Sequence, residues 1–240
     1  MTRREIISVD GIDITLTRKS AIKNLYIRIN PPDGRVTASA PLSMSIDDVR
    51  SFVIQKMPEI LEARRKFQAQ PRQTKREYVS GETCYLWGNP LMLRVIYGGK
   101  CKVEVFREVI VMHVPEGASI TKRRSVLTEW YRHELKRVLP GVIDRCCRRV
   151  GVDITGWNVR NMRTRWGSCN ITARRILLNL QLIKKPYRCL EYVVIHELVH
   201  LLEKNHTHRF RSLVERYCPN WRDIKVLLNS MPLDYVEDWS

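Results

Sequence analysis

The sequence lacks the long apolar runs of a membrane-spanning helix, because no stretch approaches about 18 consecutive apolar residues. Its first ten residues carry charge and contain no apolar core of signal-peptide length. The seven cysteines are odd in number and form no C-x-x-C pair. Neither a disulfide framework nor a cysteine-based zinc finger is therefore indicated. We expect a chain that does not enter a membrane and that works in a reducing, cytoplasmic setting.

Internal repeats and low-complexity tracts are not visible in the sequence either. Apolar residues make up 44% of the 240 residues and charged residues 28%, as in ordinary globular proteins. The chain is long enough for one large domain or two small ones.

Acidic residues are scarce, with 25 Asp and Glu against 42 Lys and Arg, and the formal net charge is +17. Such a balance favours contact with nucleic acid, anionic surfaces or acidic substrates. The alternative is a solvated basic surface, because the basic residues are spread along the whole chain.

Strand patterns dominate the beginning of the chain. Apolar residues alternate with polar ones over residues 25–40, around a turn at 31–34, which predicts a hairpin. A helix is expected from Ser45, which resembles a capping box with Asp48. Pro58 should kink or restart that helix.

The polar, basic stretch 68–76 is the best candidate for a linker. A long helical segment is expected over residues 121–150, and Pro140-Gly141 should divide it into two helices or kink it. Further strands are expected over residues 83–87, 91–96, 101–106 and 109–114. These patterns suggest a β-rich N-terminal region with one helix, residues 1–115, and a C-terminal domain, residues 116–240.

Within the C-terminal domain, the side chains follow an alternating pattern over residues 176–182, which predicts a strand. Pro186 then opens a helix that runs through Leu202. Further helices are expected over residues 208–217 and 220–229.

The expected helix after Pro186 contains the sequence His196-Glu197-Leu-Val-His200. Positions i and i+4 of a helix share one face, so the two imidazoles can bind a single metal ion. The ion lowers the pKa of a bound water to about 7. Glu197 lies beside the first ligand and can take a proton from that water. The motif predicts a zinc-dependent hydrolase. A second His-Glu pair at His133 lacks a following histidine, so we interpret His133 as a surface residue.

Zinc in a catalytic site needs a third protein ligand. If Asn205 adopts a left-handed conformation, it ends the helix near residue 204 and lets His206 return toward the ion. The His196–His206 spacing matches the metzincin pattern, although Glu203 replaces its glycine and no convincing Met-turn follows. His208 is expected to begin the next helix at the surface, and Glu203 stays a weaker alternative. The ligand candidates are His206, which we prefer, His208, Glu203 and Glu215.

Three stretches resemble the YgjP-like metallopeptidase family, a relative of the SprT-like zincins: residues 162–169, residues 178–183, and residues 192–201 with Asn205-His206 and Phe210. The hairpin near the N-terminus and residues 85–88 are also similar, so the resemblance covers most of the chain. It implies a zinc ion bound by His196, His200 and His206, a catalytic Glu197, and a compact zincin-like C-terminal domain. Thr207 and Arg211 stand where the family usually has Ser and Trp, which concerns the local substrate wall.

Other residues near the motif allow more than one interpretation. Cys169 is an improbable nucleophile because the histidines it would need are committed to metal. In the same block we expect Trp166 to pack and Gly167 to make a tight turn, and Arg165 is a candidate anion clamp. The strand from Arg175 is expected to border the cleft, where an extended peptide can add to its edge, or to be an ordinary interior strand. Three tryptophans are expected in the core: Trp130, Trp157 and Trp221.

The sequence as a whole predicts an α+β protein, with a β-rich N-terminal region followed by a zincin-like metallopeptidase domain. The expected cofactor is one Zn²⁺ per chain, held by His196, His200 and His206, with Glu197 as general base. The expected partner is a protein or peptide substrate, with nucleic acid as a further partner through the basic surface. The alternatives are a protease acting on DNA-bound proteins and a zinc hydrolase of non-peptide substrates. No oligomeric state and no oxyanion-stabilising side chain are predicted.

Overall fold

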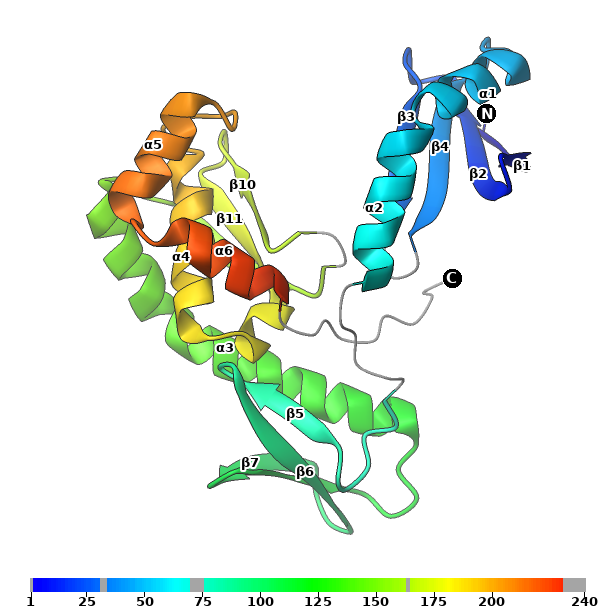
Figure 1. Ribbon diagram of the computed structural model, residues 1–240. Coiled ribbons are helices and arrows are strands. Elements are labelled where there is room, and N and C mark those ends of the chain that lie inside the picture. The colour runs from blue at the N-terminus through cyan, green and yellow to red at the C-terminus, as the bar shows by residue number, and fades with distance from the viewer. Residues whose placement is uncertain (1, 31–33, 70–75, 163–164, 231–240) are drawn as a thin grey trace. The chain divides into compact units, whose positions relative to one another are not determined.

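The computed structural model describes residues 2–30, 34–69, 76–162 and 165–230 (Figure 1). The described residues form two compact units: unit 1 lies within residues 2–69, and unit 2 lies within residues 76–230. The stretch 68–76 that the sequence indicates as a linker lies mostly outside the described residues. The two units differ from our division after residue 115, because the strands just before that point share a hydrophobic core with the helices after it.

Unit 1 is a four-stranded sheet followed by two helices. The strand order is β1-β2-β4-β3, in which two antiparallel hairpins are joined by the parallel pair β2 and β4. The hairpin expected over residues 25–40 is confirmed as β3 and β4. The strands are β1 (Thr2–Val9), β2 (Ile12–Lys19), β3 (Tyr26–Asn30) and β4 (Arg35–Pro41).

The two helices of unit 1 are α1 (Ile46–Gln55) and α2 (Met57–Ala69). The Ser45 hydroxyl caps α1 by accepting a hydrogen bond from the backbone N–H of Asp48, at 3.0 Å, as expected. The expected restart at Pro58 is confirmed, because α1 ends and α2 begins just before it. Proline has no N–H to donate and its ring crowds the preceding turn of a helix.

Unit 2 begins with a second four-stranded sheet of the same topology, in the order β5-β6-β8-β7, with β6 and β8 parallel and the two outer pairs antiparallel. All four strands lie where the sequence predicts them: β5 (Thr83–Leu86), β6 (Asn89–Tyr97), β7 (Lys102–Phe106) and β8 (Val109–Val114). A serine side chain caps the helix that follows each of the two sheets, Ser45 in unit 1 and Ser119 here. The structure therefore contains a repeated arrangement that the sequence does not reveal.

The helix after this sheet is α3 (Ile120–Val150), drawn in green in Figure 1. It is unbroken over 31 residues, so the expected division into two helices at Pro140-Gly141 is wrong. Both of these residues are exposed, whereas Leu139 and Val142 beside them are fully buried. The buried face outweighs the one backbone hydrogen bond that proline removes.

A three-stranded sheet follows α3, made of β9 (Gly156–Arg160), β10 (Gly167–Asn170) and β11 (Arg175–Asn179) in the order β10-β11-β9. The predicted strand over residues 176–182 ends early, and its last part belongs to the 3₁₀-helix η1 (Leu180–Lys184). The Asn179 side chain causes this, because its oxygen accepts from the N–H of Gln181 and its amide donates to the carbonyls of Met162 and Arg165. Since β11 is the central strand, the interior-strand alternative holds, and β10 forms an edge.

Three helices complete unit 2: α4 (Tyr187–Val199), α5 (His208–Tyr217) and α6 (Trp221–Ser230). All three are predicted, although α4 ends at Val199 rather than at Leu202. Helix α4 contacts α3, α5, α6, β10 and β11, and is therefore the central helix of unit 2. Trp130, Trp157 and Trp221 pack against the core but are only partly buried.

The architecture is thus α+β, as expected, with sheets first and most helices after them. Within the described ranges, no helix combines the length and the hydropathy that a membrane span requires.

Alanine should change the stability of the protein in opposite directions at two glycines, one inside α3 and one that caps it. Gly141 is an exposed residue of the helix interior with room for a Cβ, whereas Gly151 caps the helix with φ +76°. We expect Gly141→Ala to raise the free energy of unfolding by about 0.5–1 kcal/mol, because alanine favours the helix. Gly151→Ala should lower it by about 1 kcal/mol, because a Cβ is strained in the left-handed region. Urea denaturation of both variants beside wild type measures the difference. Equal shifts for the two substitutions would contradict this account of α3.

Candidate metal centre

The C-terminal end of α4 places two histidines on one face. His196 lies in the last turn, and His200 is the residue that caps the helix, with ring centroids 5.2 Å apart. The residues around them are anchored, since Ile195, Leu198 and Val199 are fully buried. The i, i+4 spacing therefore holds both imidazoles beside one another, as the sequence predicts.

A short return of the chain brings His206 to the same place. The N–H groups of Leu201 and Leu202 bond to carbonyls three residues back, which tightens the end of the helix. The N–H of Thr207 then bonds to the carbonyl of Asn205 at 2.7 Å, which makes a three-residue turn centred on His206. Asn205 is not among the residues with positive φ, so the expected left-handed conformation is wrong. The tight turn achieves the reversal instead.

The start of α5 holds this turn in place. The Thr207 hydroxyl caps the helix by accepting from the N–H of Phe210 at 3.2 Å. The Phe210 ring is buried and contacts all three imidazoles, with centroid distances of 5.0 Å to His196 and 4.6 Å to both His200 and His206. Phe210 is therefore the apolar support of the three histidines. Its sequence position alone gave it no role, because the contacts arise only when the turn closes.

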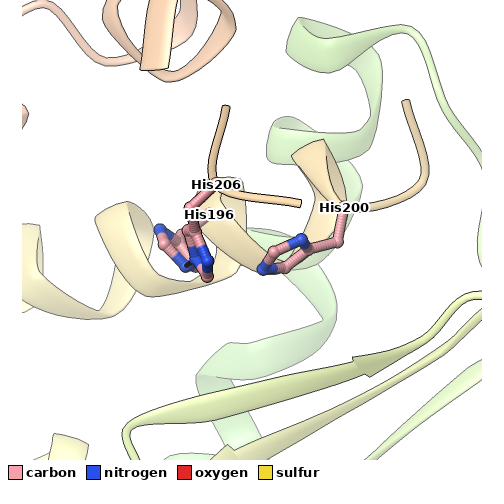
Figure 2. Close-up of side chains that lie close together, drawn as sticks. All are labelled: His196, His200 and His206. Carbon is pink, nitrogen blue, oxygen red and sulfur yellow. Dashed lines mark hydrogen bonds between the residues drawn. The ribbon is translucent and has the colours of Figure 1, made fainter. Parts of the chain in front are cut away.

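The three imidazoles form a group that fits a metal ion (Figure 2). Each offers one nitrogen, and these nitrogens lie within 4.8 Å of one another. The Nε2 atoms of His196 and His206 are 3.1 Å apart. Ligands at about 2.0–2.1 Å in a tetrahedral zinc site would be roughly 3.3–3.4 Å apart, so only a small adjustment is needed. His200 Nδ1 donates to the Lys204 carbonyl at 3.1 Å, which leaves its Nε2 for an ion.

The other ligand candidates lie outside this group. His208 begins α5 at the surface, as expected. The Glu203 carboxylate accepts from the N–H of Asn205, and the Glu215 carboxylate accepts from the Trp221 indole at 2.6 Å. His133 is a surface residue on α3, with 76% of its side chain exposed.

Burial keeps His196 and His200 in the form that binds metal. The pKa of His196 is lowered to about 4, first by burial and then by the charges of His200, His206 and Lys225. The pKa of His200 is also lowered, chiefly by burial. Neutral imidazole is the ligating form, so these two histidines need not lose a proton to bind an ion at neutral pH.

Glu197 is buried beside the histidines, with 5% of its surface exposed. Burial raises the pKa of its carboxyl group to about 8, against the opposing charge of Arg165. A carboxyl group with a pKa near neutral is suited to take up and return a proton.

Gly167 of β10 makes room for this carboxyl group. A Cβ at Gly167 would lie 2.5 Å from Glu197 Oε1 and 2.7 Å from its Cγ. Gly167 pairs with Leu178 inside the sheet rather than making the tight turn that we expected. Its role is the close approach of strand and helix, which no local sequence signal could have shown.

The site opens into a cavity of about 900 Å³, which the three histidines and Glu197 line together with side chains of β10, α5 and α6. Trp166 packs against the core beside it, as expected. Cys169 also lines the cavity, but burial and the charge of Glu197 raise the pKa of its thiol to about 11. The thiol is therefore protonated at neutral pH, which argues against a nucleophilic role.

The chain matches a known protein family over most of its length. Residues 23–231 match the YgjP-like metallopeptidase domain. The chain belongs to the YgjP-like metallopeptidase family. Two of the segments that carry the resemblance build the site: residues 162–169 contain Gly167, and residues 192–201 with Asn205-His206 contain the three histidines.

Two solved structures share some similarity with the chain, both described as metallopeptidase zymogens. Abylysin from Pyrococcus abyssi is 18% identical, with a TM-score of 0.35 over 37% of this chain and 90% of its own. Jannalysin from Methanocaldococcus jannaschii is 17% identical, with a TM-score of 0.34 over 37% of this chain and 91% of its own. No curated protein sequence matches the chain.

The Gly167 contact yields a prediction about the site. Gly167→Ala should push the Glu197 carboxyl group aside and leave the histidines in place, because the three atoms nearest to the added Cβ all belong to Glu197. We expect bound metal to stay at the wild-type level while peptidase activity falls about a hundredfold, as for a displacement near 1 Å. Metal analysis and a proteolysis assay measure the two effects. Gly141→Ala is the matched control, with both properties unchanged. Full activity in Gly167→Ala would show that the contact does not position Glu197.

Proposed function

We propose that the protein is a zinc-dependent peptidase in which His196, His200 and His206 hold the metal and Glu197 is the general base. The observation that carries the proposal is the meeting of three imidazole nitrogens beside a buried carboxyl group in one cavity. Membership of a metallopeptidase family supports a metal-dependent reaction on peptide bonds.

Zinc is the metal that we infer from the chemistry of the ligands. Imidazole nitrogen suits zinc better than the hard cations Mg²⁺ and Ca²⁺, which prefer oxygen. Three protein ligands are typical of a catalytic zinc site, in which a fourth position stays open, whereas structural zinc sites use four.

A zinc ion in this site would polarise the scissile carbonyl and make a water nucleophilic at neutral pH. Glu197 takes the proton that this water loses and delivers it to the leaving amine. Burial suits Glu197 to hold the proton between the two steps, since it raises the pKa of the carboxyl group. The positive charge of a bound ion would favour the carboxylate that first accepts the proton. Phe210 and the capped turn at Thr207 hold the imidazoles in place.

The first test concerns the metal and the base separately. We expect about one zinc ion per wild-type chain. His206→Ala should weaken zinc binding at least about a hundredfold, because a ligand is lost. Glu197→Gln should keep the zinc and lose at least about a hundredfold in activity, because the amide cannot accept a proton. Elemental analysis and cleavage of a peptide library measure these effects.

His208→Ala is the control for this test, because His208 is exposed and lies only two residues from His206. It should change neither zinc content nor activity. Wild-type protein without stoichiometric metal would overturn the proposed site. Hydrolysis of small non-peptide amides or esters in preference to every peptide would favour a zinc hydrolase of another substrate class.

The second test is removal of the metal. A ligand that binds only the folded state stabilises it, by about 2.7 kcal/mol when its free concentration is a hundred times Kd. We expect a chelator to lower the melting temperature of wild type and of Glu197→Gln equally, and added zinc to restore it. His206→Ala should respond weakly. An unchanged melting temperature on chelation in wild type would count against a metal that joins α4 to the turn after it.

A further inference from the structure

Four positively charged side chains line the same cavity as the candidate metal centre: Arg165, Lys204, Arg211 and Lys225. Glu197 is the only carboxylate among the described residues that line it, and it is buried. The cavity is therefore rich in positive charge even before a metal ion adds its own.

These four cations come from four parts of unit 2. Arg165 precedes β10, Lys204 lies in the turn after α4, Arg211 is in α5 and Lys225 is in α6. A single basic helix face would place them on one side, whereas four separate elements place them around the cavity. All four are exposed at its edge.

Salt bridges among the described residues do not neutralise these four cations. Across the part of the chain that the structure describes, none of them forms an ion pair with a carboxylate. Basic residues elsewhere in unit 2 do form such pairs, as Arg137 does with Glu134, Arg145 with Glu191 and Arg222 with Glu215. Among the described residues, some cations outside the cavity, such as Arg209, likewise lack a salt bridge, so the four are distinguished by their place in the cavity lining and not by the absence of a partner.

Unpaired charges of one sign around a concave site focus the electrostatic potential and attract ligands of the opposite sign. The cavity of about 900 Å³ is far larger than a simple anion needs. Its lining also includes the aromatic side chains of Trp166, Tyr192 and Trp221, which suit the apolar parts of a larger ligand. An extended polypeptide with carboxylate side chains combines both features.

We infer that this cavity selects acidic peptide segments, with Asp or Glu residues on either side of the bond that reaches the metal centre. The inference rests on the proposed peptidase function and specifies its substrate class. It favours a peptide over a nucleic acid because the cations surround the catalytic cavity itself, and the scissile chain must enter that cavity.

The first experiment compares peptides that share an Ala-Leu-Ala centre and differ only in flanks made of Glu, Gln or Lys. We expect the value of kcat/KM to be highest for the Glu peptide and lowest for the Lys peptide, and the difference to shrink as salt is added. Arg211→Glu and Lys225→Gln should each lower kcat/KM for the Glu peptide by about three- to tenfold. Arg211→Glu should raise it for the Lys peptide.

Arg209→Glu is the matched control. Arg209 lies on α5 two residues before Arg211 and is also exposed, but it does not line the cavity. The same change of charge on the same helix should leave the order of the three peptides and their rates unchanged. A loss in Arg209→Glu equal to that in Arg211→Glu would mean that overall charge, not the cavity, sets the preference, and would overturn the inference.

A binding experiment tests the inference independently of catalysis. Fluorescence anisotropy of the three labelled peptides with the zinc-loaded Glu197→Gln protein should show tightest binding of the Glu peptide, weakened by Arg211→Glu. Equal binding of the three peptides would overturn the inference and leave the proposed peptidase standing. Binding of the Glu peptide without cleavage by wild type would support the inference and count against the proposed function. An oligothymidylate that displaces the Glu peptide and binds more tightly would assign the cations to nucleic acid instead.

Discussion

The contact between Gly167 on β10 and Glu197 on α4 sets how closely the three-stranded sheet and the central helix of unit 2 can approach. No side chain other than that of glycine fits between them, since a Cβ would overlap the carboxyl group. The carboxyl group at this contact is buried, and burial raises its pKa. The close approach also leaves β10 as the strand beside the histidines. The same backbone position thus lies against the base and lines the cavity.

The group of histidines depends on local structure, and this explains why the sequence predicts it well. His196 and His200 are related by one turn of α4, and His206 follows within a short, capped reversal. Helix periodicity and chain length limit where such residues can go, so their types and spacing suffice. The return of the chain at His206 was predicted for the wrong reason. Asn205 does not adopt the left-handed conformation, and the Thr207 cap anchors the turn instead.

Features that depend on distant contacts could not be predicted in the same way. The tight turn expected at Gly167 is instead a contact with a helix about thirty residues later in the chain. The strand expected over residues 176–182 stops at Asn179, because that side chain bonds to the carbonyls of Met162 and Arg165. The four cations of the cavity are scattered over sixty residues and meet only in the fold. Periodicity and propensity describe each segment alone, whereas these outcomes depend on its neighbours.

The repeated sheet topology shows the same division between local and distant causes. Both sheets end near a proline, Pro41 or Pro115, and in both cases a serine four residues later caps the next helix. From this common start, α1 stops at Gln55 before Pro58, whereas α3 passes through Pro140 and continues to Val150. The difference lies in burial, because α3 has buried residues on both sides of its proline and packs against α4. Caps and turns therefore determine where the helices begin, and contact with the central helix determines that α3 becomes part of the unit that carries the histidines.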